Sequence, residues 1–253
     1  MSLFNNKTLP SKIKYNCVFQ AIIELQYQTT IPVEILTFKL FDALGNEYNR
    51  PYRTPMQDIP QIVRQSTPGM EKAICYYIKS AHDVFNIGIG DGLLSLQIIN
   101  FSYGTWDTFI NEFKKVYEKI SSFIDKKEQI GVRYVNVFED NVLPHLNIDL
   151  NVYKQSILEQ PLVLSWQNKD NEHMIKTSII NEAVINYNDL KTGETKVLYD
   201  TSIIDIDCIC RDIEDKDLLA AISENHDIVK QRFFNLCKED YIENVLIPIE
   251  ESE

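Results

Sequence analysis

Just past the middle of the chain lies the segment Ile130-Gly131-Val132-Arg133-Tyr134-Val135-Asn136-Val137-Phe138. Apolar or aromatic residues alternate in it with glycine, arginine and asparagine, which is the pattern of a β-strand with one polar surface. Because successive side chains of a strand point to opposite faces, Arg133 and Asn136 should lie on opposite faces of a sheet. The segment follows the strongest helical pattern in the chain, so we expect it to open a second copy of the preceding layout.

The first half of the chain predicts a strand, a helix, several short strands and a long helix. Residues 17–27 alternate as a half-buried strand, and Pro32 opens a helix that Gly45 is expected to end. Residues 46–69 lack periodicity and are interpreted as a long loop with at most one short regular piece. Strands are predicted at 73–79, 84–89 and 93–99, with a hairpin turn at Gly90-Asp91-Gly92. A long helix follows with Thr105 as its N-cap, and its apolar stripe predicts core packing.

The second half predicts a similar order of elements. A weak helix near 148–155 follows the opening strand, and further strands are expected at 162–167, 174–181, 183–187, 195–198 and 203–211. The last helix, at about 215–237, carries His226 on its apolar side, where a packed histidine with one hydrogen bond is expected.

These patterns predict an α+β fold made of two β-α-β(3-4)-α pseudo-repeats, with antiparallel curved sheets that each pack a long helix on one face. The order of elements resembles helix-grip and TATA-binding-protein-like folds. The expected divisions are a loose lead-in (1–15), a first repeat (16–127), a second, acidic repeat (128–240) and an acidic C-terminal tail (241–253).

The net charge of −12 is confined to one half of the chain. Residues 1–125 hold 12 basic and 12 acidic residues, whereas residues 126–253 hold 13 basic and 25 acidic residues. Such a surface repels nucleic-acid backbones and is compatible with a basic protein partner or with solubility alone. The chain shows no signal peptide and no membrane span, so we expect a cytoplasmic protein. Its five scattered cysteines are expected to be reduced and buried.

Two strands supply the candidate polar site. Asp205 and Asp207 share one face of the strand at 203–211, with Arg211 four residues beyond Asp207, and such a pair can hold a cation or raise one carboxyl pKa. Pairing of the carboxylates with Arg133 or Arg211 is the simpler expectation, and Asn136 completes the group of candidates. The run Gly88-Ile89-Gly90-Asp91-Gly92 lacks the ending of a phosphate loop and is typical of a hairpin turn.

Several segments resemble an uncharacterised, sparsely distributed family of prokaryotic proteins of about this length. They are Ala21-Ile22-Ile23-Glu24-Leu25, Tyr103-Gly104-Thr105-Trp106, Ile130-Gly131-Val132-Arg133-Tyr134-Val135-Asn136, Ile204-Asp205-Ile206-Asp207 and the last helix with His226 and Phe233. The segment from Gly131 to Asn136 is the most specific, with Val132 and Val135 where leucine and isoleucine are expected. The resemblance implies common descent and supplies no reaction. The family's patchy occurrence is similar to that of mobile defence or toxin-neutralising genes.

Three functions follow as hypotheses. The leading one is a non-catalytic protein-interaction module, an accessory or neutralising component of a bacterial defence or toxin–antitoxin-like system, which binds its partner through the acidic half. The first alternative is a small apolar-ligand binder of helix-grip type, which requires a cavity of several hundred cubic ångströms beneath residues 106–123 or 218–236. The second alternative is a metal-dependent enzyme that uses Asp205 and Asp207. No cofactor, nucleic-acid binding or membrane contact is predicted, and the oligomeric state stays open.

Overall fold

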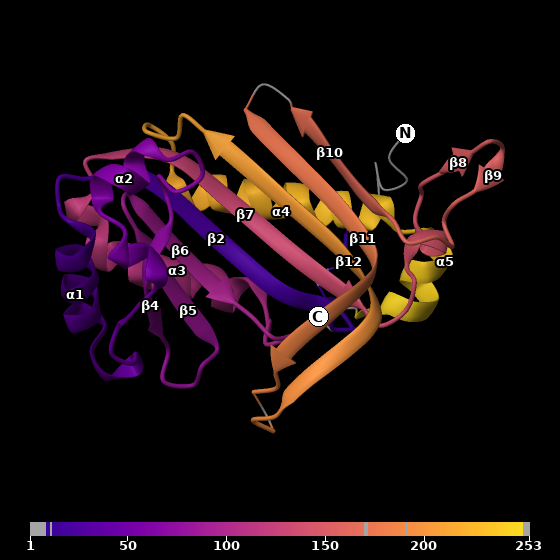
Figure 1. Ribbon diagram of the computed structural model, residues 1–253, viewed down its shortest axis with the longest axis horizontal. Helices are drawn as coiled ribbons and strands as arrows, with labels where there is room; N and C mark the ends of the chain where they lie inside the picture. The colour runs from indigo at the N-terminus through magenta and orange to yellow at the C-terminus, as the bar shows by residue number, and fades with distance from the viewer. Residues whose placement is uncertain (1–8, 11, 170–171, 191, 250–253) are drawn as a thin grey trace.

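The computed structural model describes residues 9–10, 12–169, 172–190 and 192–249. These residues form an α+β fold around a nine-stranded antiparallel sheet (Figure 1). Across the sheet the strands follow the order β10 (Val163–Lys169), β11 (His173–Asn188), β12 (Thr195–Arg211), β7 (Lys126–Phe138), β2 (Val18–Gln28), β6 (Leu93–Ile98), β5 (Phe85–Gly90), β4 (Ile74–Lys79) and β3 (Tyr52–Arg53). The strands of both halves therefore belong to one sheet, joined where β2 pairs with β7.

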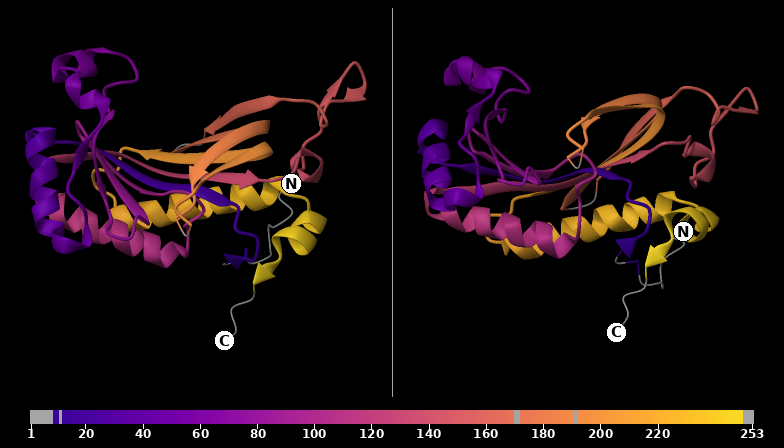
Figure 2. Two further views of the ribbon diagram at one scale, coloured as in Figure 1. Left: turned by 60° about the horizontal axis from the view of Figure 1, so that its bottom comes forward. Right: turned by 90° about the horizontal axis from the view of Figure 1, so that it is seen from below.

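The longer helices lie on one face of this sheet. They are α1 (Val33–Leu44), α3 (Trp106–Ile120) and α4 (Leu218–Leu236). Figure 2 shows α3 and α4 beneath the sheet, whereas α2 (Gln61–Ser66) and the end of the β11–β12 hairpin lie on the opposite side. None of the helices that the structure describes is both long and apolar enough to cross a membrane.

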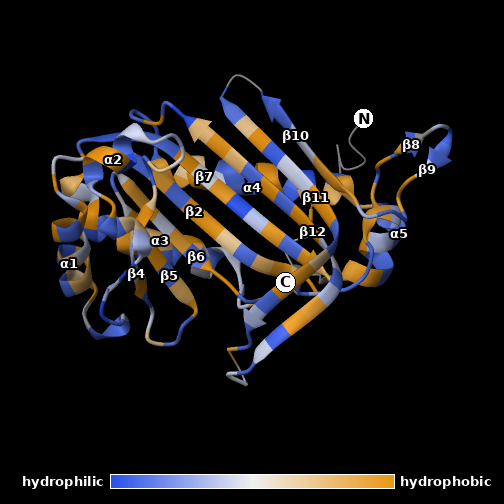
Figure 3. Cartoon of the chain, viewed as in Figure 1, coloured by the Kyte–Doolittle hydropathy of each residue, from blue (hydrophilic) through white to orange (hydrophobic). Residues whose placement is uncertain are grey.

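Strand alternation decides which face receives the helices. In β2, Ala21, Ile23, Leu25 and Tyr27 are fully buried, whereas the residues between them are partly exposed. The stripes of alternating hydropathy along β2 and β7 are visible in Figure 3. The apolar side chains on the helix face pack against the stripe of α3, whose buried members are Phe109, Phe113, Val116 and Ile120. The face opposite the helices, here called the open face, is polar over β7, β12 and β11.

The structure confirms the α+β class and most of the predicted elements. Thr105 caps α3 by accepting a hydrogen bond from the Thr108 amide, and Gly45 ends α1 as expected. All five cysteines are buried and free. The strands predicted at 174–181 and 183–187 are one strand, β11, because a bulge between Ile180 and Ala183 shifts the register without ending the strand.

Two predictions about irregular segments were wrong. Residues 148–155 form no helix: β8 (Asn151–Val152) and β9 (Gln155–Ser156) make a hairpin there, and its turn residues Tyr153 and Lys154 have positive φ. Residues 46–69 contain several short elements: η1 (Gly45–Glu47), β3, η2 (Pro55–Asp58) and α2. Two further short helices flank β7 along the chain: η3 (Ser121–Phe123) follows α3, and η4 (Leu143–His145) follows β7.

The C-terminal segment from residue 241 is not simply a tail. It contains η5 (Ile242–Leu246) after α5 (Glu239–Tyr241), and Tyr241, Ile242 and Leu246 are buried. Its last strand, β13 (Pro248–Ile249), pairs with β1 (Lys12–Ile13) from the predicted lead-in. Residues 250–253, which include three glutamates, lie outside the described residues, as do residues 1–8 of the lead-in.

Candidate functional sites

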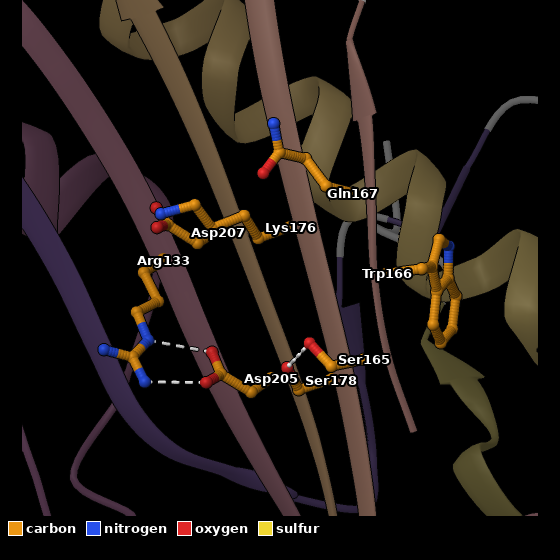
Figure 4. A pocket seen from close by; sticks show the side chains of 8 residues that line it. All are labelled: Arg133, Ser165, Trp166, Gln167, Lys176, Ser178, Asp205 and Asp207. Carbon is orange, nitrogen blue, oxygen red and sulfur yellow. Dashed lines mark hydrogen bonds and ion pairs between the residues drawn. The ribbon is translucent and has the colours of Figure 1, made fainter. Parts of the chain in front are cut away.

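The open face brings three of the five predicted polar residues together. Arg133 of β7 donates from Nε to Oδ1 of Asp205 on β12 at 2.8 Å and from a terminal nitrogen to Oδ2 at 2.6 Å. Asp207 lies on the same face, paired in register with Arg133 (Figure 4). We call Arg133, Asp205, Asp207 and the neighbouring Lys176 of β11 the open-face cluster. The predicted pairing of Arg133 with a carboxylate is therefore present, in a bidentate geometry.

Asn136 and Arg211 do not join this cluster. Asn136 lies on the helix face, as strand alternation predicts, where it is buried and donates to the Ile204 carbonyl at 3.3 Å. Arg211 is exposed and donates to Gln129 at 3.2 Å. Because Arg133 engages both oxygens of Asp205, that carboxylate is committed to an ion pair. In the described part of the chain, no group of three His, Cys, Asp or Glu residues is placed to hold a metal ion.

Asp207 is the chemically unusual member of the open-face cluster. Burial raises the pKa of its carboxyl to about 6, although the positive charges of Arg133 and Lys176 oppose that shift. An open pocket of about 480 Å³ lies over the cluster and is also lined by Ser165 and Ser178, whose hydroxyls are 3.0 Å apart. Trp166 also lines the pocket, and Figure 4 shows its side chain pointing away from Asp207, so the surroundings of the carboxyl are mostly polar.

We expect Asp207→Asn to change how stability depends on pH. The pKa of Asp207 is about 6 in the folded protein and near 3.8 in the unfolded chain, so the folded state holds the proton more tightly. The stabilisation that comes from this tighter proton binding is complete below the pKa of the unfolded chain. It is lost as the pH rises through the pKa of the folded protein. From about pH 4 to about pH 7, Asp207→Asn should therefore gain roughly 1–2 kcal/mol relative to the wild type in denaturant unfolding. The exposed control Asp42→Asn should show no such gain, and a parallel pH response in both variants would contradict the prediction.

A second site lies on the helix side of the sheet. It is a cleft of about 540 Å³ between the segment at residues 10–18, the start of α3 and the middle of α4, with β7 as its floor. Its apolar walls come from each of these elements. They include Ile13, Tyr15, Trp106, Val229, Phe233 and Phe234. The cleft is thus bounded by segments that are far apart in the sequence.

A chain of hydrogen bonds runs along the floor of the cleft. The Tyr103 hydroxyl lies 2.9 Å from the Tyr134 hydroxyl, which lies 3.1 Å from Nδ1 of His226. Trp106 stacks on the imidazole with ring centroids 3.9 Å apart and planes within 5° of parallel. These contacts fix the ring of His226 on one face and at one edge.

Burial keeps all three groups of this chain neutral. It lowers the pKa of His226 to about 4, and the positive charge of Lys230 contributes to the same shift. It raises the pKa of Tyr103 to about 12 and holds that of Tyr134 well above its usual value. At neutral pH the cleft therefore offers an uncharged imidazole and two phenols, which act as hydrogen-bond donors and acceptors.

The sequence indicated parts of this cleft but not its assembly. His226 was expected to be packed with one hydrogen bond, and both expectations are confirmed. Tyr103, Tyr134 and Trp106 were not predicted as site residues. The available signal was that Tyr134 alternates with Arg133 and so faces the helices, but nothing in the pattern indicates which helical residue it meets.

Comparison with known proteins adds no assignment: no family model matches the chain, and no curated protein matches its sequence.

Proposed function

We propose that the protein binds a small, mostly apolar molecule in the cleft between α3, α4 and the segment at residues 10–18. The observation that carries this proposal is the cleft itself, with about 540 Å³ of space, apolar walls and one convergent hydrogen-bond chain. Ligand sites are commonly concave, mostly apolar and provided with a few placed polar groups whose pKa values are shifted. The cleft has each of these properties.

The position of the cleft supports the helix-grip interpretation. A ligand binder of that type requires space beneath residues 106–123 or 218–236, and residues of both ranges line the cleft. Trp106 and Val229 come from the two long helices that cover the sheet. The cavity thus occurs where this function hypothesis requires it.

An internal duplication is part of the same proposal. On one side of the β2–β7 junction the strands run β2, β6, β5, β4 and the two-residue β3, and on the other side they run β7, β12, β11, β10. In each half the first long strand (β2 or β7) is central, and the last sheet strand of that half (β6 or β12) lies beside it. A long helix, α3 or α4, comes next in the chain. This equivalence supports two related halves, and the cleft lies where helices from both halves meet.

The neutral fluorescent probe N-phenyl-1-naphthylamine tests the proposed function. We expect saturable binding with a blue-shifted emission, because the probe leaves water for an apolar cleft. Gly104→Trp should abolish most of this binding, because Gly104 lines the cleft and a Cβ placed there meets no atom within 4 Å. The control Gln231→Trp places the same side chain at an exposed position of α4 outside the cleft lining.

Thermal unfolding would first establish that both variants are folded. Equal probe binding by Gly104→Trp and Gln231→Trp, or no binding by the wild type, would refute a ligand function for the cleft.

The protein-interaction function stays a prediction from the sequence. Its basis is the acidic excess of residues 126–253, and a bacterial defence or toxin-neutralising role is part of that prediction. A metal-dependent enzyme is less well supported, since Asp205 is engaged by Arg133.

A further inference from the structure

His226 is one of the residues that line the cleft. Its Nδ1 atom is engaged by the Tyr134 hydroxyl, and among the described residues no hydrogen-bond partner is present for Nε2. A phenol hydroxyl is a stronger acid than the N–H of a neutral imidazole, so Tyr134 donates and Nδ1 accepts. The proton of the neutral ring then resides on Nε2. The cleft therefore contains a fixed donor that requires an acceptor on the ligand.

Lys230 adds a positive charge beside this donor. It follows His226 by four residues on α4, so the two side chains share one face of the helix. Lys230 lines the cleft, and within the described residues its ammonium takes part in no hydrogen bond or ion pair. After burial, its positive charge is the second cause of the lowered pKa of the His226 imidazole.

Negative charge also lines the cleft. Asp107, in the first turn of α3, acts on Tyr103 and contributes to the raised pKa of that hydroxyl. Lys14 and Asp227, the remaining charged residues of the lining, have opposite signs. The lining thus carries two positive and two negative side chains, and its donors His226 and Lys230 lie on one face of α4.

Apolar side chains of α4 line the cleft together with these two donors. Val229, Phe233 and Phe234 follow along α4, and Tyr15 faces them from the N-terminal segment. A ligand with an acceptor head and an apolar body can therefore contact both parts of the cleft at once. Desolvation in such a setting strengthens a charge-assisted hydrogen bond.

We propose that the ligand is a small carboxylate with an aromatic or aliphatic body, and that His226 Nε2 and the Lys230 ammonium bind its carboxylate. This inference rests on the proposed function of the cleft. It specifies the chemical class of the ligand and the residues that recognise its head group. The apolar residues of α4 hold the body of the ligand.

Displacement of N-phenyl-1-naphthylamine by three compounds with one common body tests the ligand class. They are 4-phenylbutyrate, 4-phenylbutanamide and 4-phenylbutylamine, which differ only in the charge and hydrogen bonding of the head. We expect the carboxylate to displace the probe at a concentration at least about tenfold lower than the amide, because a hydrogen bond to a charged group is the stronger one. The amine should be the weakest competitor.

Substitution of Lys230 identifies the recognising residue. Lys230→Gln should remove the preference for the carboxylate over the amide, and Lys230→Arg should retain it. The control Lys119→Gln removes one positive charge from the last turn of α3, outside the cleft lining, and should behave as the wild type.

The two proposals fail in different ways. If the probe binds but the amide or the amine competes as well as the carboxylate, the ligand class is wrong and the cleft is still a binding site. If the carboxylate is preferred but Lys230→Gln keeps that preference, Lys230 is not the residue that recognises the head group. If the probe does not bind, the proposed function itself fails.

Discussion

Replacing Arg64 by methionine is expected to lower the free energy of unfolding by about 3–5 kcal/mol, because it strands a buried carboxylate. The Arg64 side chain is 3% exposed and that of its partner Asp91 is 6% exposed. Two guanidinium nitrogens donate to Oδ2 of Asp91, at 3.0 and 2.6 Å. The third donates to the carbonyls of Met56 and Ile59. Methionine fills a similar volume but satisfies none of these four acceptor contacts.

Urea unfolding of matched variants would measure this effect. The control is Arg53→Met, which breaks the Arg53–Asp58 pair, whose side chains are 61% and 73% exposed. Breaking it should cost at most about 1 kcal/mol. The double variant Arg64→Met/Asp91→Asn should regain part of the stability, since the isolated buried charge is gone. Similar losses for Arg64→Met and Arg53→Met would show that the buried pair contributes no more than a surface pair.

The Arg64–Asp91 pair also shows where reasoning from the sequence ends. The turn at Gly90-Asp91-Gly92 was predicted correctly, because the flanking strands alternate and the glycines permit the turn. Arg64 belongs to a segment that was interpreted as a long loop, since no period of 2 or 3.6 residues runs through it. The two residues are 27 positions apart, and no local pattern indicates that they meet.

The same distinction applies to the two candidate sites. Asp205 and Asp207 are two residues apart on one strand, so their common face followed from alternation, and the excess of acidic residues favoured a pairing with Arg133. The cleft joins Tyr103, Tyr134 and His226, which are separated by 31 and 92 positions along the chain. Such a chain of contacts depends on tertiary packing, which sequence periodicity does not specify.

The joining of the two expected sheets has a physical reason of its own. β2 and β7 pair along most of their length, from Val18 to Gln28 on β2. Two separate sheets would each leave one of these long strands at an edge with unpaired backbone groups. Pairing them satisfies those groups and places the apolar faces of both halves on the same side, where α3 and α4 cover them.

Gly92→Ala is expected to lower the free energy of unfolding by about 2–4 kcal/mol, because both the conformation and the space at this position exclude a side chain. Gly92 has a φ of +67°, and a Cβ built there would lie 2.3 Å from the Tyr27 carbonyl oxygen. That oxygen belongs to the backbone of β2, and the Tyr27 amide also donates to the Gly92 carbonyl at 3.0 Å. Relief of the clash therefore requires the turn to move away from β2.

Gly193→Ala separates the two causes. Gly193 has a similar φ of +71°, but a Cβ at that position meets no atom within 4 Å. Its substitution should cost only about 1–2 kcal/mol of backbone strain, so the excess loss in Gly92→Ala measures the close approach to β2. Because the same turn presents Asp91 to Arg64, movement of Gly92 should also weaken that buried ion pair. Stability losses that are equal in the two variants would mean that the turn relaxes freely and that its contact with Tyr27 does not fix the position of Asp91.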